Sequence, residues 1–281
     1  MAATEKTGQR SATSVDEAAR RTLRGLANSE RLDPMLRRLL TDALMNDNRS
    51  DRSDDPRALV SAAARSATQW IGAGLEEREK VLRDLLVLAD ALPPQPKHGP
   101  SFPDKVSSLE EILKEAEIPH AFGGALAVGY YGEPRATGDI DINVFIPIAA
   151  WPSIREAMAS LQIQVDVDDR ELQQTDELRL DWGLVPVHLF FASDSLHQQM
   201  REGVREVPFS DSVIPLVAPE HPVIRKAILA RPKDWHDIEQ ILVVASPLDL
   251  TEIESWLERM VGIEDPRMKK LGEMKAALSL D

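Results

Sequence analysis

The stretch FGGALAVGYYGEPRATGDIDINVFIP, residues 122–147, decides the fold of this chain. Polar and apolar residues alternate in its last third, which predicts a β-strand over 139–145. Side chains two positions apart share one face of a strand, so Asp139, Asp141 and Asn143 are expected to project together. Two carboxylates on one face repel each other unless a cation lies between them. Mg²⁺ commonly joins such carboxylates to phosphate groups, so we predict a Mg²⁺ site at Asp139 and Asp141.

The first part of the stretch carries two adjacent glycines, Gly123 and Gly124, between a predicted strand and a predicted helix. Glycine has no Cβ, so backbone N–H groups at this turn can approach a phosphate closely. The N-terminus of a helix also attracts anions. In the loop EPRATG, Arg135 adds a positive charge. The sequence therefore predicts a phosphate site beside the carboxylate pair.

Outward from this stretch, helix-like and strand-like patterns follow each other without an internal repeat. The predicted strands cover 119–122, 139–145, 161–168, 204–208 and 213–217, with a hairpin over 177–192. The predicted helices cover 125–131, 149–160, 195–202, 219–230, 232–245, 249–261 and 266–278, and a capping box is expected at Ser107 or Ser108 with Glu110 or Glu111. This order predicts an α+β fold, a mixed sheet flanked by helices.

Changes in composition divide the chain into regions. The proline-rich segment PPQPKHGPSFP is typical of a semi-rigid linker. Before it, leucines recur at helical spacing, and after it the mixed pattern described above begins. The predicted regions are a disordered tail (1–14), an N-terminal helical region (15–92), the linker (93–103), an α/β domain (104–218) and a C-terminal helical region (219–281).

Composition limits the classes of protein that fit. The chain of 281 residues is 43% hydrophobic and 28% charged, so it can bury a core. It contains no cysteine, which excludes disulfides, thiolate metal sites and a cysteine nucleophile. No stretch approaches the ~20 apolar residues needed to span a bilayer, and no secretory signal is recognisable. We therefore expect a cytoplasmic protein without a membrane partner.

Charge is distributed unevenly along the chain. Residues 1–100 carry 16 Lys or Arg and 15 Asp or Glu, so the net charge of −14 arises from the remainder. A broad basic surface for nucleic acid is not expected from such a composition. The arginines near the N-terminus are interpreted as solvated helix faces, although contact with RNA stays open.

Two segments resemble a known family. GGALAVGYYGEPRATGDIDINV (123–144) resembles the signature of the DNA-polymerase-β-type nucleotidyltransferase superfamily. Within it, the chain looks most like the AbiEii-type nucleotidyltransferases, the toxins of type IV toxin–antitoxin systems. The segment HPVIRKAILARPKDWHDIEQIL (221–242) is similar to that family's lysine-containing helix and the Lys/Arg-x-Asp-x-x-Asp helix after it. The resemblance covers roughly 104–245, and residues 1–100 carry none.

The resemblance implies roles for individual residues. Asp139 and Asp141 would hold Mg²⁺, commonly two ions, which binds a nucleoside triphosphate and activates an attacking hydroxyl. Gly123 and Gly124 would receive the triphosphate. The implied reaction is nucleotidyl transfer, in which a hydroxyl attacks the α-phosphate and pyrophosphate leaves.

The second segment implies further roles. Lys226 would neutralise phosphate charge, and Arg135 would contribute to the phosphate clamp. Asp234, or Asp237 three positions on, would anchor the region of Lys226 or position the nucleotide. A cognate antitoxin is the partner that a type IV toxin implies.

The chain departs from the superfamily at the third carboxylate. The superfamily usually carries it on the strand after the Asp-x-Asp region, and the best strand here, VPVHLFF, presents His188 at that position. A neutral imidazole can ligate a metal or act as a base, but it is a poorer Mg²⁺ ligand than a carboxylate. We interpret His188 as a candidate catalytic residue.

Three functions remain open on these grounds. The first is a Mg²⁺-dependent nucleotidyltransferase that acts as a type IV toxin and adds nucleotides to RNA, such as a tRNA 3′ end, or nucleotidylates a protein. The second is a nucleotidyltransferase for a small molecule of the aminoglycoside type, whose positive charge suits an acidic protein. The third is a nucleotide-binding or partner-binding module with an eroded active site, which His188 in place of a carboxylate would favour.

Overall fold

The computed structural model describes most of the chain from residue 72 onward. The described residues are Arg24, Arg37, Thr41, 72–90, 99–161, 163, 175–245 and 247–280. The predicted tail, most of the N-terminal helical region and all but two residues of the strand predicted over 161–168 lie outside them. The regions predicted from composition stay predictions.

A six-stranded mixed sheet forms the centre of the molecule. Its strands lie in the order β3-β4-β2-β1-β6-β5, with bounds β1 His120–Phe122, β2 Ile140–Val144, β3 Glu177–Trp182, β4 Val185–Phe191, β5 Arg205–Phe209 and β6 Ser212–Leu216. The pairs β2–β4 and β1–β6 are parallel, and the other three neighbouring pairs are antiparallel. This sheet with its flanking helices confirms the predicted fold class.

Alternating burial fixes which face each strand presents to the core. On β4, Val187, Leu189 and Phe191 are fully buried, whereas His188 and Phe190 between them are only partly buried. The parallel register pairs Ile140 with Val187 and Asp141 with His188, so the apolar side chains of both strands lie on one face. The polar side chains consequently line the opposite face.

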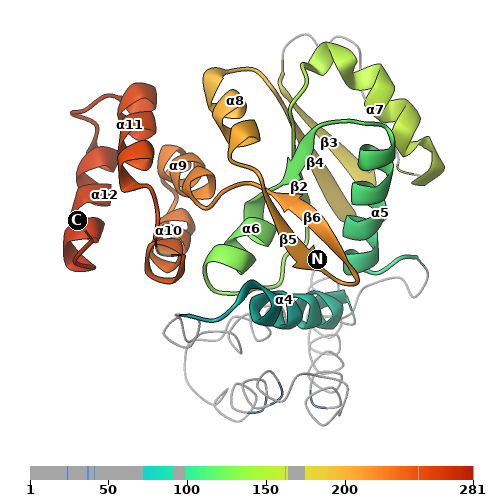
Figure 1. The fold of residues 1–281 in the computed structure, drawn as a ribbon, viewed down its shortest axis with the longest axis horizontal. Helices are drawn as coiled ribbons and strands as arrows, with labels where there is room; N and C mark the ends of the chain where they lie inside the picture. The colour runs from blue at the N-terminus through green and yellow to red at the C-terminus, as the bar shows by residue number, and fades with distance from the viewer. Residues whose placement is uncertain are drawn as a thin grey trace, which may run out of the picture.

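Helices cover both faces of the sheet. Figure 1 shows α5 (Phe102–Glu115) and α7 (Trp151–Ala157) on one side, and α6 (Gly124–Tyr131) and α8 (Ser195–Glu202) on the other. The α5 helix begins earlier than we expected. The capping box is formed by Ser101, whose hydroxyl accepts from Asp104 N, and by the Asp104 carboxylate, which accepts from Ser101 N. Pro103 is tolerated in the first turn because that turn needs no N–H donor, so the helix can begin after Ser101. Ser107 and Ser108 therefore lie inside the helix.

Four helices follow the sheet in the chain, and the first two of them pack beside α6. They are α9 (Glu220–Leu229), α10 (Pro232–Val244), α11 (Leu250–Val261) and α12 (Pro266–Ala277). All four match helices predicted from the sequence within one or two residues at each end. In α9 and α10 the buried side chains include Val223, Ile224, Ile238 and Ile241, which join the core cluster of the sheet.

The helix α4 (Leu75–Asp90), upstream of the proline-rich segment, packs against the same core. Leu82 and Leu86 are fully buried members of the core cluster. Arg78 Nη1 donates to the carbonyl oxygen of Tyr130 in α6 at 2.8 Å, and the Glu79 carboxylate accepts from Ser210 N at 2.9 Å. These contacts attach α4 to α6 and to the β5–β6 turn.

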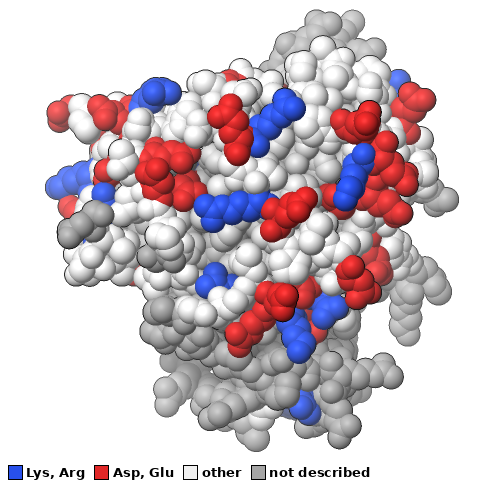
Figure 2. Space-filling model, viewed as in Figure 1, with Lys and Arg blue, Asp and Glu red and all other residues white. Residues whose placement is uncertain are grey.

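Two surface properties bear on partners. Across the described ranges, the helices are too short or too polar to cross a membrane. On the face drawn in Figure 2, acidic and basic side chains are interspersed, and that face carries no continuous basic area.

Candidate active site

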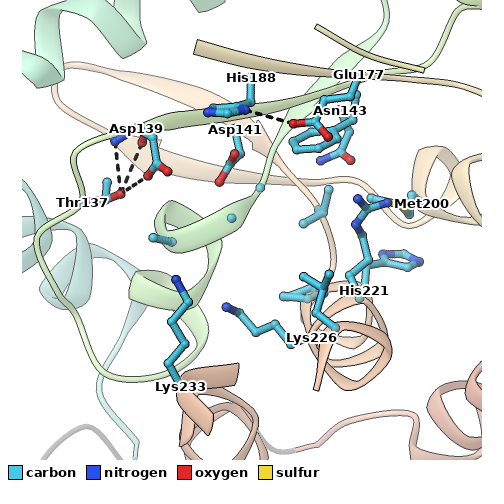
Figure 3. Close-up of a pocket in the computed structure, with 18 of the residues that line it drawn as sticks. Thr137, Asp139, Asp141, Asn143, Glu177, His188, Met200, His221, Lys226 and Lys233 are labelled. Atoms are coloured by element: carbon cyan, nitrogen blue, oxygen red, sulfur yellow. Dashed lines mark hydrogen bonds and ion pairs between the residues drawn. The ribbon is translucent and has the colours of Figure 1, made fainter. Parts of the chain in front are cut away.

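The carboxylate pair lies where β2 begins. Asp141 is on the strand, whereas Asp139 immediately precedes it and is exposed. The Thr137 hydroxyl donates to Asp139 Oδ1 at 2.6 Å and so fixes the carboxylate of Asp139 in the turn before the strand (Figure 3). Ile140 and Ile142 point into the core. Both carboxylates therefore face the polar side of the sheet, as the alternation predicts.

Burial changes the acidity of Asp141. Loss of solvent raises the pKa of its carboxyl to about 6, and the charge of Asp139 contributes to the increase. Among the described residues, no donor forms a hydrogen bond with the Asp141 carboxylate. A carboxylate that is crowded by a second one and lacks a donor is suited to receive a cation.

The two glycines are required by their neighbours on β2. Gly124 has φ 55°, and a Cβ at this position would lie 1.6 Å from Asp141 Oδ2. A Cβ on Gly123 would lie 2.7 Å from Asn143 Nδ2. The backbone of Gly123 is tied to the same strand, because its N–H donates to the Asp141 carbonyl oxygen at 2.9 Å. The start of α6 and the Asp141 carboxylate thus lie in direct contact, with no side chain between them.

Basic residues from the C-terminal helices form the opposite wall. Lys226 in α9 donates to Asp237 Oδ2 at 2.7 Å, and Arg135 donates to the same oxygen at 3.0 Å. Asp237 therefore holds together two cations from distant parts of the chain. Asp234 is fully buried and lies 3.7 Å from Lys226 Nζ. Its carboxylate mainly binds the backbone and guanidinium of Arg231 at the start of α10.

The two walls enclose a cleft of about 440 Å³ (Figure 3). Figure 3 shows Asp139 and Asp141 above the turn at the start of α6, with Lys226 and Lys233 directed toward them from the helices below. The residues lining this cleft are Gly123, Gly124, Ala125, Arg135, Thr137, Asp139, Asp141, Asn143, Glu177, His188, Phe190, Met200, Val217, His221, Pro222, Arg225, Lys226, Leu229, Arg231 and Lys233.

The cleft contains most of the residues expected from the sequence. Both glycines, Arg135, the carboxylate pair, His188 and Lys226 line it, whereas Asp234 lies behind its wall. The sequence named Asp234 first and Asp237 second, but Asp237 makes the closer contact with Lys226. The spacing of the two acids could not separate them, because which one faces α9 depends on how α9 and α10 pack.

His188 lies beside the carboxylate pair and has a partner that sequence reasoning missed. Asp141 and His188 are directly paired across β2 and β4. Nδ1 of His188 lies 3.1 Å from Glu177 Oε1 on the neighbouring strand β3, an interaction also drawn in Figure 3. The alternation of exposed and buried residues in β3 was visible in the sequence, but its register against β4 was not.

The arrangement fits a metal ion only if a ligand supplies further donors. Within the described ranges, the structure shows no group of three or more His, Asp or Glu side chains placed to hold a metal. Two carboxylates with two nearby backbone N–H groups and a cationic wall match a Mg²⁺ ion shared with phosphate oxygens. The donor set therefore fits Mg²⁺ together with a polyphosphate.

Comparisons with known proteins give partial likenesses of fold. No protein-family model matches the chain, and no curated protein matches it. The solution structure of the antibiotic-resistance factor ANT(2'')-Ia is 15% identical, covers 55% of this chain and 88% of its own, and has a TM-score of 0.42. The crystal structure of ANT(2'')-Ia with adenylyl-2''-tobramycin is 14% identical, with coverages of 56% and 95% and a TM-score of 0.42.

A third structure is an antigenic nucleotidyltransferase-like protein from Paracoccidioides brasiliensis. It is 16% identical, covers 59% of this chain and 91% of its own, and has a TM-score of 0.40. Because these likenesses are remote, we derive the proposed function from the residues of this chain.

Proposed function

We propose that the protein transfers a nucleoside monophosphate from a nucleoside triphosphate to an acceptor hydroxyl, with release of pyrophosphate. One observation carries this proposal: the Asp139 and Asp141 carboxylates face a cationic wall across a turn that only glycine can form. Such a cleft binds a phosphate chain and a divalent cation together, and it brings their charges close to the reacting phosphorus.

Mg²⁺ is the cofactor in this proposal. Asp139 and Asp141 would hold it, and Thr137 keeps the Asp139 carboxylate in place. When bound, the ion supplies positive charge that stabilises the phosphoryl oxygens and the leaving group. Oxygen atoms of the triphosphate would complete the coordination that two carboxylates leave open.

The nucleotide is positioned by the chain itself. Backbone N–H groups at Gly124 and Ala125 begin α6 and are available to the triphosphate. Lys226 and Arg135 contribute positive charge, and Asp237 fixes the direction of both side chains. Asp234 acts indirectly in this proposal, because it holds Arg231 and the start of α10 in place.

His188 is the candidate base. The acceptor oxygen forms a bond to the α-phosphorus, the bond from this phosphorus to the pyrophosphate oxygen breaks, and the hydroxyl proton passes to Nε2 of His188. Glu177 accepts a hydrogen bond from Nδ1, so the second ring nitrogen is available as the proton acceptor. A correctly placed base typically contributes about 10²–10⁴-fold in rate.

The acceptor in this proposal is a nucleic acid, such as the 3′ end of tRNA, which corresponds to a type IV toxin with a cognate antitoxin. Five Lys or Arg line the cleft, and two of them, Arg225 and Lys233, form no ion pair with a described residue, although the chain as a whole has a charge of −14. Cations without an acidic partner favour anionic ligands. A polycationic acceptor of the aminoglycoside type would meet charges of its own sign there.

One experiment tests the proposal and separates the acceptors. The full chain is incubated with Mg²⁺ and each α-labelled nucleoside triphosphate, together with total RNA, a protein lysate or an aminoglycoside. We expect label in RNA, and none with the double variant Asp139→Asn/Asp141→Asn. Label in the aminoglycoside would replace the nucleic-acid acceptor, and Mg²⁺-dependent nucleotide binding without any transfer would support a non-catalytic module.

A further inference from the structure

Five cationic side chains line the cleft, and their partners differ. Asp237 pairs with Arg135 and Lys226, and Asp234 pairs with Arg231. Within the part of the chain that the structure describes, Arg225 and Lys233 form no ion pair. Lys233 is exposed to solvent, whereas Arg225 is partly buried, so an anion that reaches Arg225 replaces solvation that its guanidinium has lost.

Arg225 is held in a defined position although no carboxylate binds it. Its guanidinium lies 5.1 Å from the centre of the Phe190 ring, the distance of a cation–π contact. Such stacking uses the flat face of the guanidinium and leaves its N–H edges available for hydrogen bonds. Phe190 is paired with Asn143 on β2 and with Glu177 on β3. The guanidinium of Arg225 therefore lies near these two positions of the sheet.

This position differs from that of the lysine beside it in sequence. Consecutive residues of an α-helix project about 100° apart, so Arg225 is directed to Phe190 while Lys226 is directed to Asp237. Asp141 and Asn143 are two strand positions apart, which is about 7 Å along β2. Arg225 therefore lies on the Asn143 side of Asp141, and Asp139 lies on the opposite side of Asp141.

We propose that Arg225 forms a separate oxyanion-binding subsite, in which its guanidinium binds a phosphate group at the Phe190 end of the cleft. The choice of phosphate as the ligand rests on the function proposed above. The phosphate belongs either to the tail of the nucleoside triphosphate or to the acceptor, and the guanidinium is suited to both because it binds two oxygens at once.

Equilibrium binding to two probes tests the subsite. Tripolyphosphate with Mg²⁺ represents the tail of any nucleoside triphosphate, and a single-stranded oligoribonucleotide with a 3′ hydroxyl represents a phosphate-bearing acceptor. Arg225→Met is expected to weaken the binding of one probe about 10-fold or more, as the loss of charged hydrogen bonds implies. Weaker tripolyphosphate binding assigns Arg225 to the nucleotide, and weaker oligoribonucleotide binding assigns it to the acceptor.

The control is Arg259→Met in α11. Arg259 stacks on Trp256 at 4.6 Å, the same kind of contact, but it does not line the cleft, so neither probe should bind differently. Arg225→Lys keeps the charge and loses the planar fork, and an intermediate loss is expected. If Arg225→Met does not fold, Arg225→Lys provides the test.

The outcomes separate the subsite from the function. Binding of both probes to the Arg225 variants as tightly as to the wild type overturns the subsite, and so does a wild type that binds neither probe. Label transfer by the wild type is measured in parallel. If Arg225→Met weakens probe binding but the wild type transfers no label, the subsite is supported and the proposed function is contradicted.

Discussion

At the scale of single residues, the site depends on atoms that are absent. Gly124 adopts φ 55°, and the space that a Cβ would occupy is filled by the Asp141 carboxylate. The acid can approach the start of α6 only because residue 124 has no side chain. The position of the Asp141 carboxylate therefore depends on the small size of Gly124 as well as on the charges around it.

We predict that Gly124→Ala lowers stability and also abolishes Mg²⁺-dependent nucleotide binding. The left-handed backbone alone costs about 1–2 kcal/mol for a residue with a Cβ, and the contact with Asp141 adds to this. Urea denaturation and calorimetric titration with nucleotide measure the two effects. Gly272→Ala in α12 is the matched control, because nothing lies within 4 Å of its added Cβ. It should be neutral or stabilising by about 0.5–1 kcal/mol.

His221 is a second residue whose environment can be tested. Burial, together with the charge of Arg205, lowers the pKa of its imidazole from an ordinary 6.5 to about 4. The folded protein therefore holds a neutral ring at pH values where the unfolded chain binds a proton. Stability should decline as the pH falls from about 6.5 to 4, by about 3 kcal/mol in total at about 1.4 kcal/mol per pKa unit.

The measurement compares wild type with His221→Gln from pH 7 to pH 4. Other groups titrate in both proteins, so the difference between their unfolding free energies isolates the imidazole. That difference should change by about 3 kcal/mol across the range, with the variant less sensitive to acid. Parallel curves for the two proteins would contradict a neutral buried ring.

At the scale of elements, one carboxylate connects the loop before β2 with two helices. Asp237 in α10 accepts from Lys226 in α9 and from Arg135 in the loop. Only 6% of its side chain is exposed. The position of the cationic wall relative to the carboxylate pair therefore depends on the packing of α9 against α10.

We predict that Asp237→Ala destabilises the protein by about 3–5 kcal/mol, because two cations lose their shared partner at a buried position. Asp181→Ala is the matched control. Its pair with Arg179 leaves more than half of each side chain exposed, and such pairs contribute about 0–1 kcal/mol. Urea denaturation measures the unfolding free energy of both variants. Equal decreases in the two variants would show that Asp237 does not stabilise the packing of α9 against α10.

At the scale of the whole molecule, the chain before the proline-rich segment contributes to the same core as the sheet. Leu82 is fully buried against α6. Its Cδ1 atom lies 2.8 Å from the position that a Cβ on Gly129 would occupy. The core cluster contains residues from α4, from the sheet and from the C-terminal helices. We expect these parts to unfold together.

The corresponding prediction concerns Leu82→Ala, which should cost about 2–5 kcal/mol through the cavity it leaves. Val87 on the same helix is 46% exposed, and Val87→Ala should cost far less. Circular dichroism reports all helices. In a Trp70→Phe background, tryptophan fluorescence reports only Trp151, Trp182, Trp235 and Trp256, which all follow α4 in the chain. A single shared transition is expected, and separate transitions would mean that α4 belongs to an independent unit.

The sequence by itself determined the local structure of this protein. The alternation around Asp141 and through 185–191, the glycine pair and the spacing of apolar residues in the C-terminal helices predicted elements that the structure contains. Each of these signals acts between residues two to four positions apart, where strand and helix geometry alone decides which side chains share a face. The same reasoning placed Asp139 and Asp141 on one side of the sheet.

Only the tertiary structure decided which elements meet. The parallel pairing of β2 with β4 brings His188 beside Asp141, and the register of β3 brings Glu177 to His188. The packing of α9 on α10 selects Asp237 over Asp234 as the close partner of Lys226. Strand order and helix rotation result from burying apolar area contributed by segments far apart in the chain, and no short-range pattern encodes that sum.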